Sequence, residues 1–296
     1  MSDSTSTLAA ATIGSAVPAG SFPLAIHSVF PGAVNLQPAG GGMLVTLLTW
    51  AAPELPQGIR LTTTEDFTTR GLEPHGRGRS TQAGIFLDRH GAPPLHVAFS
   101  KAVRAVPAPL PCLGPPGPAW QLAATLLGQA QAQAGTDLRL DDLLGQACPQ
   151  GGLGRRLASA ARALGDAVRA AAPGALRTAF SSLVGLGCGL TPSGDDFLCG
   201  FLIAAHCRTT GDRQRLELLQ ELQASTQACL AGTNTISATF LRCAAEGKAC
   251  SSLQDLVQAF QDGTDCRKAL ADLCAIGHSS GMDLTTGFLY GLSLWA

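Results

Sequence analysis

The sequence has 296 residues, with 20 Lys or Arg, 21 Asp or Glu and a net charge of −1. Only 14% of the residues are charged, against a usual share of about 25%. With 46% hydrophobic residues the chain can bury enough apolar surface to fold as a globular protein. A nearly neutral chain without a Lys/Arg-rich run has no electrostatic footprint for nucleic acid or an anionic membrane, so we expect neither partner.

We also expect neither a membrane-spanning helix nor a signal peptide. Residues 4–53 carry no formal charge, but prolines interrupt them before the ~20 apolar residues that a membrane-spanning helix needs. No Lys or Arg precedes Arg60, so the positive start of a signal peptide is absent. The ten cysteines form no Cys-x-x-Cys pair and do not resemble a secreted disulfide scaffold. We expect a cytoplasmic protein.

The first third of the chain is typical of strands and turns. Short apolar or β-branched runs, separated by Pro and Gly, predict strands at 26–30, 34–36, 43–50, 59–61, 85–87 and 95–97. We expect a flexible N-terminal tail over residues 1–20 and a small β-rich domain over 21–105. Residues 106–118 are too rich in proline for a helix or a sheet interior, and we expect a stiff linker there.

Helical periodicity follows this linker. Candidate helices lie at 120–134, 138–144, 154–172, 175–184, 192–206, 212–230, 236–246, 252–260, 265–276 and 280–294. The predicted fold class is therefore α+β, with a small N-terminal β-rich domain followed by a larger, mainly α-helical domain over 119–296. This second domain carries a short internal repeat.

A glycine-rich segment, residues 185–200, stands apart. Its sequence, GLGCGLTPSGDDFLCG, places alternate glycines before Thr191 and Pro192, a good N-cap followed by a proline of the first helical turn. A loop that feeds a helix N-terminus offers N–H groups and partial positive charge to a phosphate or carboxylate. The segment predicts an anion site formed by Gly187, Gly189, Thr191, Ser193 and Gly194.

Two consecutive acids follow this loop. One acid suffices to complement a helix dipole, so Asp195 and Asp196 together exceed what capping requires. They could orient a substrate amide, accept a proton, or hold a divalent metal such as Mg²⁺ that bridges to phosphate oxygens. The sequence alone does not choose among these roles.

A second segment repeats part of the first. Residues 193–202, SGDDFLCGFL, align without gaps on residues 280–289, SGMDLTTGFL, with six of ten positions identical. The repeat adds Ser280 and Gly281 as candidate binding residues and Asp283 as a candidate catalytic or metal-binding carboxylate. We expect the two helix openings to face one ligand from opposite sides. The alternative is a duplicated helical hairpin that retains capping and packing residues.

Three further residues are candidates, two of them just before the second opening and one at a third helix opening. Ser279 is a candidate binding residue, and His278 could donate to the ligand or act as an acid, or be a capping or surface residue. Asn234 belongs to a polar cluster, residues 233–237, that opens another predicted helix. This cluster either caps that helix or faces the substrate.

The glycine-rich segment, together with Ser280-Gly-x-Asp283 and the early residues 28–36, SVFPGAVNL, resembles the AllH family. That family is named for a subunit of the oxamate carbamoyltransferase of anaerobic allantoin degradation. The resemblance spans about residues 27–291, and the Ser/Ala-rich N-terminus and the many cysteines are departures from the family pattern. It implies a three-subunit enzyme that interconverts oxalurate plus phosphate with oxamate plus carbamoyl phosphate.

Together with the sequence pattern, the resemblance gives a hypothesis for the roles of these residues. The turn 191–194 would hold phosphate, while Asp196 and Asp283 would orient the carbamoyl NH2 group or bind a metal. The expected partners are these small anions (carbamoyl phosphate, phosphate, oxamate or oxalurate) and two other carbamoyltransferase subunits. A non-catalytic anion-binding or scaffolding subunit and a metal-dependent hydrolase are the alternatives.

Overall fold

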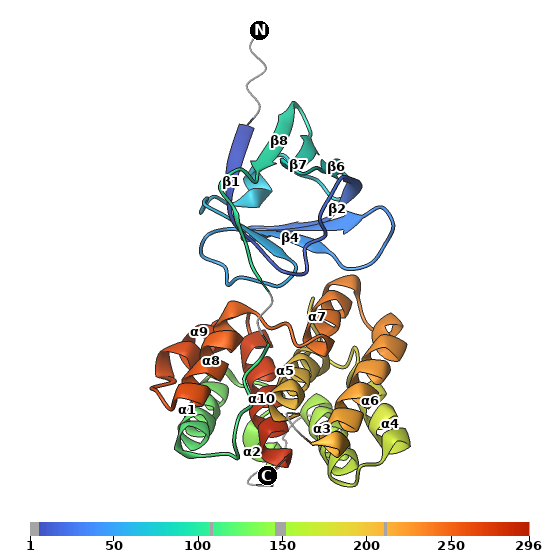
Figure 1. The fold of residues 1–296 in the computed structure, drawn as a ribbon, viewed down its shortest axis with the longest axis vertical. Helices are drawn as coiled ribbons and strands as arrows, with labels where there is room; N and C mark the ends of the chain where they lie inside the picture. Colours follow the sequence, from blue (N-terminus) through green and yellow to red (C-terminus); the bar gives the residue numbers. More distant parts are fainter. Residues whose placement is uncertain (1–5, 107–108, 146–151, 210–211, 296) are drawn as a thin grey trace. The chain divides into compact units, whose positions relative to one another are not determined.

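The protein consists of two compact units, residues 1–108 and 109–296 (Figure 1). The structure is a computed structural model and describes residues 6–106, 109–145, 152–209 and 212–295. The first unit is built of strands and the second of helices, which confirms the predicted α+β class. Within the described residues, no helix is long and apolar enough to cross a bilayer.

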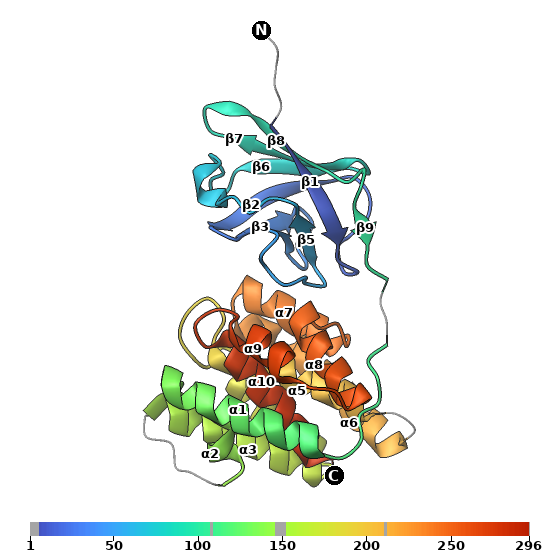
Figure 2. The same ribbon diagram turned by 90° about the vertical axis from the view of Figure 1, so that its left-hand side faces the viewer.

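The N-terminal unit is one nine-stranded sheet. Its strands are β1 (Ser6–Ile13), β2 (Phe22–Phe30), β3 (Ala33–Pro38), β4 (Val45–Leu48), β5 (Gly58–Leu61), β6 (Arg77–Ser80), β7 (Gly84–Arg89), β8 (Ala92–Ala98) and β9 (Val103–Arg104). They lie in the order β5-β4-β3-β2-β6-β7-β8-β1-β9. Because β5 also pairs with β1, the sheet closes on itself (Figure 2).

Alternating side chains fill the inside of this closed sheet. Leu24 and Ile26 of β2 are buried, while their neighbours in the strand are exposed. The single-turn helix η1 (Phe67–Thr69) adds Phe67 to the same core. The predicted strands therefore form because their apolar faces share one enclosed interior.

The flexible tail expected over residues 1–20 is wrong for its central part. Residues Ser6–Ile13 form β1, which pairs with β5, β8 and β9. Ala10 and Ile13 are buried in the core. The strand β6, sequence RGRS, was not predicted either, because it has no apolar alternation and owes its conformation to main-chain pairing with β2 and β7.

The C-terminal unit is helical. Its helices are α1 (Pro118–Ala134), α2 (Leu140–Leu143), α3 (Gly152–Arg169), α4 (Pro173–Leu183), α5 (Ser193–Arg208), α6 (Arg213–Cys229), η2 (Leu230–Gly232), α7 (Thr235–Ala245), α8 (Ser251–Asp262), α9 (Arg267–Cys274) and α10 (Ser280–Leu294). The last part of the predicted linker belongs to this unit. Leu113 is buried there, and its main chain bonds to Cys207 and Arg208 at the end of α5.

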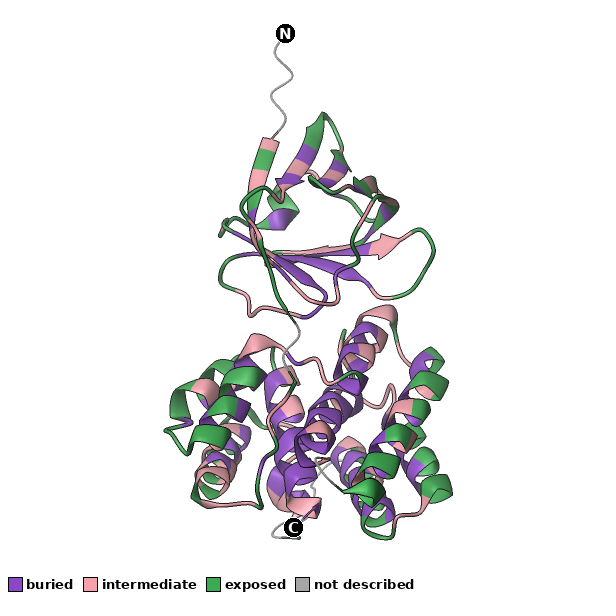
Figure 3. Ribbon diagram, viewed as in Figure 1, coloured by how far each residue is buried: buried purple, intermediate pink, exposed green. Residues whose placement is uncertain are grey.

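Helices α5 and α10 form the centre of this unit, and the other helices surround them (Figure 3). A β-carbon on Gly200 of α5 would lie 1.9 Å from the Leu284 oxygen of α10. A β-carbon on Gly287 of α10 would lie 1.9 Å from the Phe197 oxygen of α5. In the aligned repeat Gly200 corresponds to Gly287 and Phe197 to Leu284, so each of these contacts maps onto the other. Helices α5 and α10 are therefore related by an approximate two-fold axis. Glycine lets their backbones touch.

The two helices run parallel. Thr191, just before α5, bonds to Ser280 at the start of α10, and further along a β-carbon on Gly291 would lie 2.6 Å from Cβ of Ala204. Contacts thus advance in the same direction along both chains. Both helices therefore begin at the same end of the pair.

Replacing Gly200 or Gly287 with Ala forces these backbones apart. We expect each variant to lose about 1–3 kcal/mol of unfolding free energy, or more, because a carbonyl oxygen cannot move aside like a flexible side chain. Denaturant unfolding measures this loss. Gly128→Ala is the control: it lies within α1, its new β-carbon would make ordinary contacts, and helix propensity favours Ala by about 1 kcal/mol. Equal stabilities for Gly128→Ala, Gly200→Ala and Gly287→Ala would contradict the close crossing.

Candidate functional site

The two Ser-Gly-x-Asp segments lie side by side. Each begins its helix, α5 at Ser193 and α10 at Ser280. The hydroxyl of Thr191 lies 2.7 Å from that of Ser280. The glycine crossing holds α5 and α10 parallel, so both openings lie at the same end of the pair; that they face one ligand stays a prediction. Thr191 is not the N-cap: Pro192 takes that place, and the Thr191 hydroxyl joins the two openings instead.

Turns that contain glycine lead into both helices. Gly187 and Gly189 adopt φ values of 137° and 93°, the left-handed region that the alternate glycines predicted. The N–H of Gly194 donates to Leu186, and the N–H of Gly281 donates to Ile276. Glycine is required at both positions, since a β-carbon would lie 2.1 Å from the Leu183 oxygen or 1.9 Å from the Leu273 oxygen. Two of the helix N–H groups expected to bind an anion are thus already occupied.

Asp195 holds the glycine-rich loop in place. One carboxylate oxygen accepts the N–H of Gly185 at 2.8 Å, and the other accepts the hydroxyl of Thr233. Burial raises the pKa of Asp195, while these hydrogen bonds oppose the rise. Both oxygens have partners within the protein, so this carboxylate positions the loop against the segment that precedes α7.

Asn234 joins the same two segments. Its side-chain oxygen caps α7 by accepting the N–H groups of Ile236 and Ser237. Its amide group donates to the Leu190 oxygen at 2.9 Å. Both functional groups of the side chain are therefore engaged in capping α7 and in fixing the glycine-rich loop.

Asp196 and Asp283 each lie near a serine hydroxyl at the start of the other helix. Ser280, at the start of α10, and Thr191 stabilise the ionised form of Asp196 on α5. Ser193, at the start of α5, and Ser279 do the same for Asp283 on α10. The crossed Ser–Asp pairs exchange places under the internal repeat. The four hydroxyl residues are partly exposed, whereas Asp196 and Asp283 are only 7% and 1% exposed. The carboxylates lie beneath a rim of hydroxyls.

These two carboxylates are not fully satisfied. Among the described residues, no hydrogen bond of good geometry reaches either oxygen of Asp283 or Oδ2 of Asp196. Burial is the largest influence on both groups: it raises the pKa of Asp283 to about 7, and it raises the pKa of Asp196 strongly, with a further contribution from the charge of Asp283. Buried carboxylate oxygens without partners are costly, which makes them the strongest indication of a ligand in the described structure.

His278 is exposed at the edge of the rim, and no hydrogen bond joins it to the aspartates in the described residues. No group of three or more His, Cys, Asp or Glu side chains suited to a metal occurs in the described part of the chain. A metal at this site would be held by Asp196, Asp283 and hydroxyls alone.

Sequence reasoning missed two arginines near the loop. Arg155 and Arg156, at the start of α3, line an open hollow of about 490 Å³ together with Ser159, Ser182 and Leu186. Leu186 is the residue of the glycine-rich segment that accepts the Gly194 N–H. The exposed guanidinium groups have no ion-pair partner among the described residues. The Arg-Arg pair was visible in the sequence, but only the fold brings it beside the loop.

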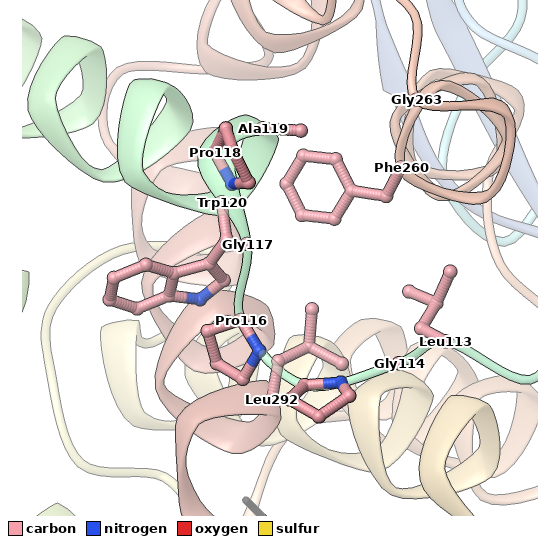
Figure 4. Close-up of a pocket in the computed structure, with 11 residues that line it drawn as sticks. Leu113, Gly114, Pro116, Gly117, Pro118, Ala119, Trp120, Phe260, Gly263 and Leu292 are labelled. Atoms are coloured by element: carbon pink, nitrogen blue, oxygen red, sulfur yellow. The ribbon is translucent and has the colours of Figure 1, made fainter.

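A second hollow, of about 350 Å³, has a different character. Trp120, Phe260 and Leu292 surround it together with the proline-rich residues 114–118 (Figure 4). Its lining is largely apolar and carries no titratable side chain. It therefore adds no acid, base or metal ligand to the site.

The raised pKa of Asp283 predicts a pH dependence of stability. The folded state holds this proton up to about pH 7, whereas an unfolded Asp releases it near pH 4, so stability falls as the pH rises between these values. Replacing Asp283 with Asn removes this loss, which amounts to at most roughly 4 kcal/mol at about 1.4 kcal/mol per pKa unit.

Unfolding measured in the presence of a chelator checks this prediction. The stability of Asp283→Asn relative to wild type should increase from pH 4 to pH 8. Asp255→Asn, on the exposed side of α8, should show no such trend. A constant difference between Asp283→Asn and wild type across this range would contradict the raised pKa of Asp283, because the folded and unfolded states would then bind the same number of protons.

The comparisons with known proteins agree with this architecture. Residues 183–292 match the family model described as oxamate carbamoyltransferase subunit AllH. Residues 4–104 match the model described as the AllH family N-terminal domain. No solved structure matches the chain. The first match contains both Ser-Gly-x-Asp segments and the second contains the described strands of the N-terminal unit up to Arg104, so the chain belongs to the AllH family.

Proposed function

We propose that this chain is a catalytic subunit of an oxamate carbamoyltransferase, which converts oxalurate and phosphate to oxamate and carbamoyl phosphate. The observation that carries the proposal is the convergence of Asp196 and Asp283 beneath the hydroxyl rim. It lies within the segment matched by the family model. Two other subunits would complete the enzyme.

The reaction requires three contributions from the protein: stabilisation of an oxyanion, a proton for the leaving nitrogen and orientation of the carbamoyl group. A phosphate oxygen attacks the carbamoyl carbon of oxalurate and forms a tetrahedral oxyanion, then the C–N bond breaks and the nitrogen of oxamate takes up a proton. A hydroxyl of the rim formed by Thr191, Ser193, Ser279 and Ser280 can stabilise the oxyanion by turning its single O–H from an aspartate to the substrate, which neutralisation of that aspartate by a proton or a metal permits. His278 at its edge is the proposed proton donor. Asp196 and Asp283 orient the carbamoyl group, directly or through a metal.

The anionic end of the substrate needs positive charge, which the rim itself lacks. Arg155 and Arg156 supply two guanidinium groups in the hollow beside Leu186. Guanidinium forks match the geometry of carboxylates and phosphates. We therefore assign the carboxylate group of oxalurate or oxamate to this hollow, with the turn 191–194 at the scissile carbamoyl group.

A reconstituted complex tests the function directly. Oxalurate-dependent release of carbamoyl phosphate, measured with and without this chain, should require the chain. Asp196→Asn should lower turnover at least tenfold while the three proteins still co-purify. Wild-type turnover by Asp196→Asn would contradict the catalytic role. Co-purification with no change in turnover on omission of the chain would favour a scaffolding subunit instead.

The arginine assignment has its own test. Replacing both Arg155 and Arg156 with Ala should raise KM for the anionic substrate roughly 10- to 100-fold with a smaller effect on kcat, because a charged hydrogen bond contributes about 1.5–3 kcal/mol. Steady-state kinetics of the complex measures this change. Arg177→Ala is the control, since Arg177 on α4 pairs with Glu221 and does not line the hollow. An unchanged KM in the double variant would show that the hollow does not bind the substrate.

A further inference from the structure

Two buried carboxyl groups at one place can both ionise only if positive charge is supplied, and the protein supplies little. In the described structure, the main influences on Asp196 and Asp283 include no Lys, Arg or His; the charged groups among them are Asp195, Asp137 and, for Asp196, Asp283 itself. All of these are acids. Buried charges in proteins are normally paired or coordinate a metal.

The helix termini compensate only part of this charge. Each helix N-terminus carries roughly half a positive charge, so α5 and α10 together offset about one of the two negative charges. An amide NH2 group of a substrate has only partial charge and would leave the remainder uncompensated. A bound cation would supply the missing charge.

The donor atoms indicate which cation. Asp196 and Asp283 present carboxylate oxygens, and the neighbouring side chains of Thr191, Ser193 and Ser279 present hydroxyls. Oxygen donors select hard cations, and Mg²⁺ is usually held by one or two carboxylates and completes its shell with water and substrate phosphate. No third His, Cys, Asp or Glu suited to a metal joins them in the described residues, so hydroxyls, water and phosphate would complete the shell.

We propose that Asp196 and Asp283 form a divalent-cation site of the Mg²⁺ type, lying on the approximate two-fold axis between α5 and α10 and binding its cation together with phosphate. The unpartnered oxygens of Asp283 and Asp196 are the observation that points to the ligand. A divalent ion exceeds the missing charge by about one unit, which an oxyanion then balances. The phosphate half of this inference rests on the proposed function, whereas the cation half does not.

Mn²⁺ is the probe, because binding abolishes the EPR signal of the free aqueous ion. The full chain, stripped of metal with a chelator, should bind one Mn²⁺ that excess Mg²⁺ displaces. Inorganic phosphate should tighten Mn²⁺ binding, and Mn²⁺ should tighten phosphate binding by the same factor, since linkage is reciprocal.

Variants identify the ligands. Asp196→Asn and Asp283→Asn should each weaken Mn²⁺ binding at least tenfold and by similar factors, because the two carboxylates are equivalent under the repeat. Ser280→Ala, which removes a hydroxyl and no charge, should weaken it less. Asp255→Asn should bind as wild type does. Circular dichroism of each variant in chelator verifies that it is folded.

The contrary results are equally definite. No stoichiometric Mn²⁺ binding at millimolar concentration, or equal binding by wild type and both Asn variants, would overturn the cation site and leave the carboxyls neutralised by protons. Turnover of the complex in chelator, without Mn²⁺ binding, would reject this inference and leave the proposed function standing. Mn²⁺ binding without turnover in the reconstituted complex would reject the proposed function and leave the cation site standing.

Discussion

The close crossing of α5 and α10 is the contact on which the site depends. Gly200 and Gly287 let each backbone touch the carbonyl of the other helix, and side chains at those positions would prevent the approach. Because the helices cross in parallel, both Ser-Gly-x-Asp openings arrive at the same end. The crossed pairing of Ser280 with Asp196 and of Ser193 with Asp283 is a consequence. The crossing of α5 and α10 therefore determines both the packing of the helical core and the positions of the carboxylates.

The low charge of the chain acquires a structural meaning here. In a protein with 41 charged residues, three carboxylates are buried around the two helix openings. Asp195 is satisfied by Gly185 and Thr233 and fixes the loop. Asp196 and Asp283 retain oxygens without partners in the described structure. Neighbouring acids of the same motif therefore differ in their hydrogen bonding: both oxygens of Asp195 have partners, whereas Oδ2 of Asp196 has none in the described structure.

The sequence predicted the fold class and the location of the motif, but not its geometry. Repetition of Ser-Gly-x-Asp and Gly-Phe-Leu indicated two equivalent helix starts, since these patterns are local. Whether the starts face one another or lie side by side depends on the direction of helix packing, which local patterns do not encode. The strand Ser6–Ile13 was missed for a similar reason, because long-range pairing determines its conformation. Arg155 and Arg156 needed the fold to bring α3 beside Leu186.

The convergence of Asp196 and Asp283 is the central claim, and a carboxyl-carbon NMR titration tests it most directly. In metal-free buffer the pKa of Asp196 should lie well above 3.8 because of burial, and it should fall when Asp283 is replaced with Asn, since a neighbouring negative charge is removed. An Asp196 that titrates near 4 in both proteins, or whose pKa is unaffected by Asp283→Asn, would contradict the account.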